Sequence, residues 1–231
     1  MSVGPDTLVL MASWFVVFVF STTLHEAGHA WAALRLGDAT AYGGGQVSLN
    51  PLPHIRREPV GMVAVPLVSF FLIGWMFGWA SAPYDPQWAH RHPRRAALMA
   101  LAGPLGNLTL LIAAIFLIRT GIGLGIFEVS PYGRWDQLVV MAGSPSTGGP
   151  ATIVSLLFSL NLILFVFNLL PVPPLDGSGV IQLFMSEDVA RTVQGIFRQP
   201  MVGWMGILIA WQFFGNFFMP IARFARTFLY P

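Results

Sequence analysis

Long apolar runs constrain this chain more than any other feature of its sequence. Residues 8–20 (LVLMASWFVVFVF), 98–118, 151–170 and 201–218 are almost free of charge. About 20 apolar residues in a helix are needed to cross the hydrocarbon core of a bilayer. The chain is 55% hydrophobic and 10% charged, whereas a soluble domain carries roughly a quarter of charged residues. The sequence therefore predicts an all-α polytopic membrane protein.

We expect about five membrane helices joined by shorter segments. The helices are predicted over residues 7–36, 59–80, 94–119, 151–171 and 200–218. Glycines and a short alternation at 42–49 indicate a hairpin or extended loop within 38–58, and a loop rich in Gly, Pro and Ser is expected over 120–150. Residues 172–199 read as a polar connector with one short helix. We expect one domain over 1–231, with its core at 7–185 and no separate regulatory domain.

The arginines conflict with a simple membrane crossing at 59–80. Arginines that mark a cytoplasmic side follow the first helix and also precede the helix at 94–119, namely Arg35, Arg56 and Arg57, then Arg91, Arg94 and Arg95. One crossing between these two groups cannot satisfy both. We predict that 59–93 enters the membrane and returns, with the proline-rich stretch 81–93 as the return leg. Non-helical backbone at that depth must be covered by protein or water, so the return leg should line a cavity.

The segment His25-Glu26-Ala27-Gly28-His29 carries the strongest chemical signal. Positions i and i+4 share one face of a helix, so both imidazoles can bind one Zn²⁺ while Glu26 takes a proton from the metal-bound water. The alternative is a pair of histidines packed against lipid headgroups. Three ionisable residues at the end of an apolar run are costly, which favours a function. We predict a site for one zinc ion.

A catalytic zinc site needs a third protein ligand, and this chain has no cysteine to supply it. Asp176 is a candidate because it follows the helix at 151–171, in Leu175-Asp176-Gly177. The same three residues also suit an ordinary turn, since Asp-Gly is a common turn pair. The other candidates are the remaining histidines and the other carboxylates, among them Glu128, Asp136, Glu187 and Asp188. The residues alone leave this choice open.

Three segments, in this order along the chain, resemble the site-2 protease family of intramembrane zinc metalloproteases. They are His25 to His29, then Ala102-Gly103-Pro104-Leu105-Gly106-Asn107, then Asn168 through Pro171 to Asp176-Gly177. Asn50-Pro51-Leu52-Pro53-His54 resembles a compact subgroup of that family. The resemblance runs from about residue 20 to 185 and implies that Asp176 is the third zinc ligand. Where the subgroup has a single Asp soon after the histidine, this chain has Arg56-Arg57-Glu58, with Glu58 as the candidate substitute.

Two further residues are candidates for catalysis. Asn168 would point into the bundle and could hydrogen-bond the substrate carbonyl or an oxyanion, or it could simply join helices. His54 could orient substrate or stabilise charge near the zinc, or it could be an ordinary interfacial histidine. His90 and His92 are weaker candidates. The 42–49 segment is the expected strand edge for holding an unwound substrate.

We therefore predict a zinc metalloendopeptidase that cuts membrane-spanning or membrane-associated proteins with zinc-activated water. A metal transporter is an alternative, but the middles of the 94–119 and 200–218 helices lack the charged residues of an ion path. A catalytically silent homologue is another, although it would not need Glu26. The net charge of +2 argues against nucleic-acid binding. We expect a multi-pass protein of a prokaryotic cytoplasmic membrane, with its site toward the cytoplasm, in contact with lipid and a membrane-protein substrate; a homo-oligomer is left open.

Overall fold

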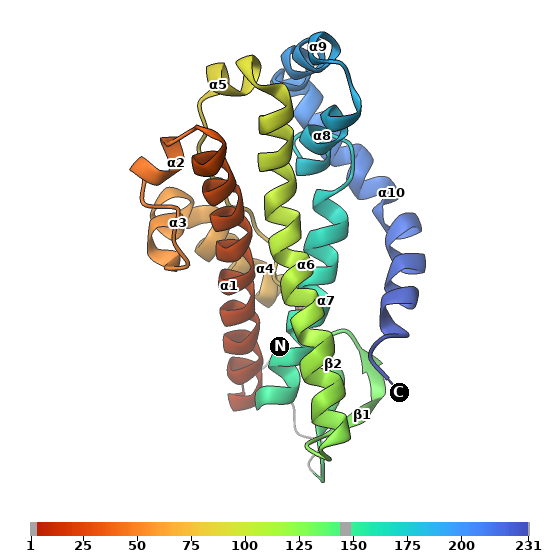
Figure 1. Ribbon diagram of the computed structural model, residues 1–231. Coiled ribbons are helices and arrows are strands. Elements are labelled where there is room, and N and C mark those ends of the chain that lie inside the picture. Colours follow the sequence, from red (N-terminus) through yellow and green to blue (C-terminus); the bar gives the residue numbers. More distant parts are fainter. Residues whose placement is uncertain (1–3, 144–148, 231) are drawn as a thin grey trace.

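The computed structural model describes residues 4–143 and 149–230 and shows an elongated bundle of helices (Figure 1). Within the described residues, four helices are long and apolar enough to cross a membrane: α1 (Pro5–Leu36), α6 (Pro93–Gly123), α7 (Gly149–Asn168) and α10 (Pro200–Arg226). They confirm the predicted all-α membrane fold and four of the expected helices. The last one, α10, continues past the predicted end at residue 218.

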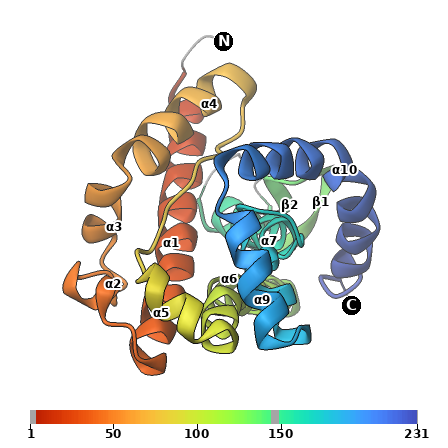
Figure 2. The same ribbon diagram turned by 90° about the horizontal axis from the view of Figure 1, so that it is seen from above.

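Helices α1, α6 and α7 form the inner bundle, while α10 stands on the side away from α1 (Figure 1, Figure 2). Glycine lets α1 and α6 approach each other closely. A Cβ on Gly28 would lie 2.8 Å from the carbonyl oxygen of Ala102, and one on Gly106 would lie 3.3 Å from the carbonyl oxygen of Leu24. The polar end of α1 is therefore pressed directly against the α6 backbone.

Between α1 and α6 the chain leaves one end of the bundle and returns to it (Figure 1). Asp38, just after α1, accepts a hydrogen bond from Asp85 N at 2.8 Å, so the two ends of this segment lie together. The apolar helical stretch Val60–Ile73 is about 21 Å long, less than the roughly 30 Å of a hydrocarbon core. The chain over 59–93 runs out and back as expected, although the return leg begins at Gly74, earlier than expected; its entry into the membrane stays a prediction. The helices of this part are α2 (Thr40–Gly43), α3 (Pro51–Arg57), the π-helical turn η1 (Val60–Ala64), α4 (Val65–Ile73) and α5 (Pro86–Arg91).

The non-helical return leg is held against protein. Trp79 N donates to Gly61 O at 3.2 Å, which ties the return leg to the outgoing one. Ser81 Oγ donates to Glu58 Oε1 at 2.6 Å. Glu58, the candidate substitute for the subgroup's aspartate, therefore fastens the return leg to the end of α3.

The sequence predicts a hairpin or an extended loop within 38–58, and the hairpin alternative is wrong. Residues 42–49, all of them described, form no strand. Gly45 adopts φ +74°, and Gln46 N then donates to Ala41 O at 3.0 Å, so the chain closes into a turn after α2. The glycine run favours this turn because glycine takes a positive φ at little cost. Because residues 42–49 form no strand, they offer no strand edge to a substrate. The Gln46 side chain donates to Ser81 O at 3.1 Å and ties the turn to the return leg.

A two-stranded antiparallel hairpin lies at the opposite end of the bundle, where a loop was expected (Figure 1). It pairs β1 (Phe127–Arg134) with β2 (Gln137–Met141), and Phe127 stands opposite Met141. The β2 strand is buried against α7, where Ser155 Oγ accepts from Leu138 N at 3.0 Å. Residues 144–148 of the expected loop lie outside the described residues.

After α7, a turn leads into α8 (Asp176–Val180), the 3₁₀ turn η2 (Ile181–Phe184) and α9 (Glu187–Phe197). These elements lie at the end of the bundle where α1 ends (Figure 1). The predicted polar connector is confirmed, with more helix than expected. Gly206 of α10 packs so closely on the turn that a Cβ there would overlap Pro173 O.

Candidate metal centre

Two imidazoles and one carboxylate converge beside α6. His25 and His29 lie one turn apart on α1, and their Nε2 atoms are 3.0 Å apart. Asp176 Oδ2 lies 3.1 Å from His25 Nε2, and Asp176 Oδ1 lies 3.3 Å from His29 Nε2. The three side chains each offer one ligand atom, all within 4.8 Å of one another. The structure thus brings together the three predicted zinc ligands.

The turn after α7 aims Asp176 at the histidines. Gly177 is buried, and a Cβ there would overlap the carbonyl oxygens of Leu169 and Leu170. Only glycine permits this tight return of the chain over the end of α7. Helix α8 then packs on α6, where a Cβ on Gly179 would come 2.7 Å from Ala100 Cβ. In the Leu-Asp-Gly segment, Asp176 therefore supplies the carboxylate, and Gly177 allows the turn that places it beside the histidines.

Gly103 of α6 forms the floor of the centre. A Cβ at this position would overlap His29 Nε2 and would lie 2.7 Å from His25 Nε2. The missing side chain leaves open the space that both ring nitrogens face. Helix α6 carries Pro104 next to this glycine, and proline has no N–H to donate to the preceding turn.

The hydrogen bonds of the two rings leave their lone pairs pointing at the centre. His25 Nδ1 lies 2.6 Å from Asn107 Oδ1, and His29 Nδ1 lies 2.8 Å from Met99 O. In a neutral imidazole the hydrogen is then on Nδ1 and the lone pair on Nε2. Asp176 Oδ2 is buried and has no hydrogen-bond donor among the described residues. Two nitrogen lone pairs and a carboxylate thus meet with no hydrogen between them, and a divalent cation such as Zn²⁺ fits this donor set.

Two carboxylates give the centre its charge. Asp176 holds its carboxylate oxygens 3.1 Å from His25 Nε2 and 3.3 Å from His29 Nε2. The ionised carboxylate is the form that binds metal. The Glu26 side chain is 6% exposed and accepts no hydrogen bond from the part of the chain described. Its carboxylate is therefore available as a base beside the metal ligands.

Residues 13–210 match the model of peptidase family M50. The chain belongs to peptidase family M50. A Bacillus subtilis (strain 168) protein named "Putative zinc metalloprotease YwhC" is 34% identical over 176 residues, which cover 76% of this chain and 70% of that protein. "Putative zinc metalloprotease Rip2" of Mycolicibacterium smegmatis is 27% identical over 186 residues, which cover 80% of this chain but only 61% of the relative. No solved structure matches the chain.

Membership in family M50 confirms the site-2 protease resemblance and zinc as the cofactor. The four membrane-capable helices make this M50 protein an integral membrane protein. The same family assignment identifies it as a metalloprotease at the level of reaction class. The cleavage of substrates within the membrane goes further and belongs to the proposal below.

Two predicted catalytic residues lie outside the trio of zinc ligands. Asn168 ends α7 and is half-buried, and its side chain makes no hydrogen bond within the described residues. His54, on α3, is 1% exposed; its Nε2 lies 3.1 Å from Ser48 O, while its Nδ1 has no described partner. The catalytic roles given to both residues remain predictions.

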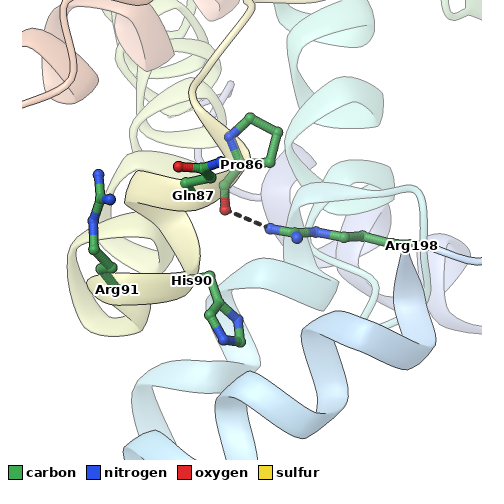
Figure 3. Close-up of a pocket in the computed structure, with 5 residues that line it drawn as sticks. All are labelled: Pro86, Gln87, His90, Arg91 and Arg198. Carbon is green, nitrogen blue, oxygen red and sulfur yellow. Dashed lines mark hydrogen bonds between the residues drawn. The ribbon is translucent and has the colours of Figure 1, made fainter.

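A hollow of about 440 Å³ opens between α5 and the end of α9 (Figure 3). Its walls are Pro86, Gln87, His90, Arg91 and Arg198, and Arg198 Nη2 donates to Pro86 O at 2.9 Å across it. It shares no residue with the zinc centre. His90 therefore belongs to this separate hollow and not to the metal site of the M50 protein.

Gly103 and Asn107 shape the centre, although neither is a predicted site residue. Both stand in the quoted segment Ala102-Gly103-Pro104-Leu105-Gly106-Asn107. The available signal was physical: glycine in an apolar helix marks a close approach, and an asparagine there needs a polar partner.

Proposed function

We propose that this protein is an intramembrane zinc metalloendopeptidase that cleaves a peptide bond in a membrane-spanning or membrane-associated protein. One observation carries the proposal. The buried His25 and His29 and the half-buried Asp176 lie beside Glu26, and three of these four residues stand on a helix that can cross a membrane. A metal and a base thus share a position that a soluble protease would not use.

The length of α1 supports a site within the bilayer. The helix has 32 residues, about 48 Å in all, against a hydrocarbon core of roughly 30 Å. A centred helix enters that core about 9 Å from each end, and His25 lies about 16 Å from the end at Leu36. His25 would then lie roughly 7 Å, and His29 roughly 2 Å, inside the hydrocarbon region.

The chain's residues divide the chemistry between them. His25, His29 and Asp176 hold the zinc ion, which polarises a water molecule and the substrate carbonyl when it is bound. Glu26 accepts a proton from the attacking water on its carboxylate and then delivers it to the leaving amide nitrogen. The Asn168 amide is proposed to donate a hydrogen bond to the substrate carbonyl oxygen, and His54 is proposed to stabilise the negative charge that develops on that oxygen during the attack. Both of these contacts are proposed contacts with a bound substrate.

The arginines favour a site near the cytoplasmic face. The end of the bundle where α1 ends and α6 begins carries more arginines than the end with the β-hairpin. Arginines in short loops next to membrane helices favour the cytoplasmic side. They are Arg35, Arg91, Arg94, Arg95, Arg191 and Arg198, with Arg56 and Arg57 beside them on α3, against Arg119, Arg134, Arg223 and Arg226. We place the protein in a prokaryotic cytoplasmic membrane with its zinc centre on that side.

The decisive experiment compares wild type, Glu26→Gln and Glu187→Gln in liposomes that contain single-span model proteins, with fragments read by mass spectrometry. Glu26→Gln should keep stoichiometric zinc and lose about 100-fold or more of the cleavage rate, because it removes the general base. Glu187→Gln is the matched control, since Glu187 is an exposed partner of Arg191 on α9. It should cleave like wild type.

Three other outcomes would refute the proposal. Cleavage that survives Glu26→Gln would remove the proposed base. Zinc that accumulates inside the liposomes without cleavage would favour the transporter. Stoichiometric zinc with no cleavage of any model substrate by the wild type would favour a silent homologue.

A further inference from the structure

A buried chain of side-chain amides starts at zinc ligand His25 and crosses three helices. His25 Nδ1 lies 2.6 Å from Asn107 Oδ1 on α6, and Asn107 Nδ2 donates to Asn161 Oδ1 on α7 at 2.9 Å. Asn161 Nδ2 then donates to Ser21 Oγ, back on α1, at 2.9 Å. Ser21, Asn107 and Asn161 are each 0% exposed, so water does not compete for these bonds. Asn161 and Ser21 lie outside every segment that pointed to the zinc site.

Two backbone carbonyls fix the direction of these hydrogen bonds. Asn161 Nδ2 also donates to Leu157 O at 2.8 Å, and Asn107 Nδ2 also lies 3.4 Å from Ser21 O. A carbonyl can only accept, so each amide must turn its nitrogen toward these oxygens. A flipped Asn107 would place its oxygen against Asn161 Oδ1, acceptor against acceptor. The oxygen of Asn107 is therefore held toward His25.

We infer that Asn107 and Asn161 are positioning residues that hold His25 in its Nδ1–H tautomer, with the Nε2 lone pair toward zinc. Asn107 accepts the ring hydrogen, and Asn161 acts only through Asn107 by fixing the direction of that amide. Hydrogen-bond partners of zinc-binding histidines set ring orientation and tautomer in this way. The inference deepens the proposed function, because it rests on the same zinc site.

Polar side chains also join membrane helices without any role at a metal, so the network must be separated from simple helix packing. A packing role affects stability and leaves zinc affinity alone. A positioning role affects zinc affinity, and it does so through one path. Substituting Asn161 in a protein that already lacks Asn107 should then cause no further loss of zinc affinity, because the effects of two substitutions that act through the same contact are not additive.

The test measures zinc affinity by chelator competition for the full chain in detergent, with helicity and thermal unfolding as checks on the fold. Asn107→Leu should weaken zinc binding about 10- to 100-fold, the usual effect of losing such a partner. Asn161→Leu should weaken it about fivefold, the equivalent of one hydrogen bond. The double variant should bind zinc no more weakly than Asn107→Leu. Gln46→Leu is the control, since Gln46 is a buried amide that bonds Ser81 O, far from the network in the fold, and it should match wild type.

A milder pair keeps the test decisive if the asparagine variants do not fold. Ser21→Ala removes an acceptor of Asn161, whereas Ser159→Ala removes an equally buried hydroxyl that bonds Trp135 O. Weaker zinc binding by Ser21→Ala alone supports the inference, and equal affinities for the pair overturn it. Wild-type affinity in Asn161→Leu, or additive losses in the double variant, also overturn it while leaving the proposed function intact. A wild-type protein that binds no zinc would overturn both.

Discussion

Replacing Gly103 with alanine places a methyl group where the two zinc-binding histidines meet. The added carbon would lie 2.7 Å from His25 Nε2 and would overlap His29 Nε2. Non-bonded heavy atoms settle at about 3.5 Å, so His25 Nε2 would retreat by about 0.8 Å and His29 Nε2 by more. Metal–ligand distances tolerate deviations of only about 0.2 Å. We therefore expect zinc affinity to fall by about 100-fold or more, beyond the loss typical of an indirect partner.

The same substitution should leave the helix intact, which makes the prediction sharp. Gly103 lies inside α6 and is not among the glycines with positive φ. Alanine favours a helix over glycine by about 1 kcal/mol, and the imidazoles can turn away from the methyl group. Zinc per chain after purification in detergent, chelator competition and thermal unfolding would measure both effects. Gly123→Ala, in the same helix with open space around it, is the control. Stoichiometric zinc at wild-type affinity in Gly103→Ala would refute the geometry on which the zinc site rests.

Three further predictions address the surroundings of the site. Although burial raises the pKa of Asp38, hydrogen bonds from Thr40 and from Asp85 N outweigh it and lower that pKa. The stabilisation that ionised Asp38 gives to the folded protein is therefore complete above its ordinary pKa and is lost as the pH falls through the lower pKa of the folded state. Asp38→Asn should lower the free energy of unfolding by about 2 kcal/mol at pH 7 and by less in acid. Unfolding in detergent at several pH values would measure both. Cysteines placed at positions 57 and 91 should react with an impermeant thiol reagent from the same side of the membrane, and reaction from opposite sides would exclude the out-and-back path. Ser155→Ala should lower the unfolding free energy by about 1 to 3 kcal/mol, because it leaves a buried backbone N–H unpaired, with zinc affinity unchanged.

The part of the zinc site that could be predicted from the residues alone is the part that lies on a single helix, α1. His25, Glu26 and His29 are close in the chain, so helical periodicity alone brings them to one metal. Asp176 is different, because no local pattern says where the chain lies after α6 and α7 have been traversed. The residues left several carboxylates open, and only the resemblance selected Asp176. The role of Asn161 could not be predicted from the sequence, since that role depends on its hydrogen bond with Asn107 on another helix.

The β segments show why pattern reading failed elsewhere. The alternation at 42–49 looked like a strand, but three successive glycines and a bond from Gln46 to the return leg stabilise a turn. The hairpin at 127–141 looked like a loop because it lies in a stretch rich in turn-forming residues. Its β2 strand is stabilised by burial on α7 and by Ser155, which the sequence places beyond the following loop. Tertiary contacts decided both cases, as is common for short strands.

Charge gives a reason why the partner of His25 is an amide. Bound zinc brings two positive charges, and ionised Asp176 and Glu26 bring two negative ones, so the loaded centre is close to neutral. Zinc-binding histidines often donate to a carboxylate, but a carboxylate in place of the fully buried Asn107 would add a third negative charge to the centre, and buried charge is expensive. The amide orients the ring without that cost. Without zinc the two carboxylates are poorly compensated, so zinc binding should stabilise the packing of α1 against α6 and α8, and occupancy and folding should be linked.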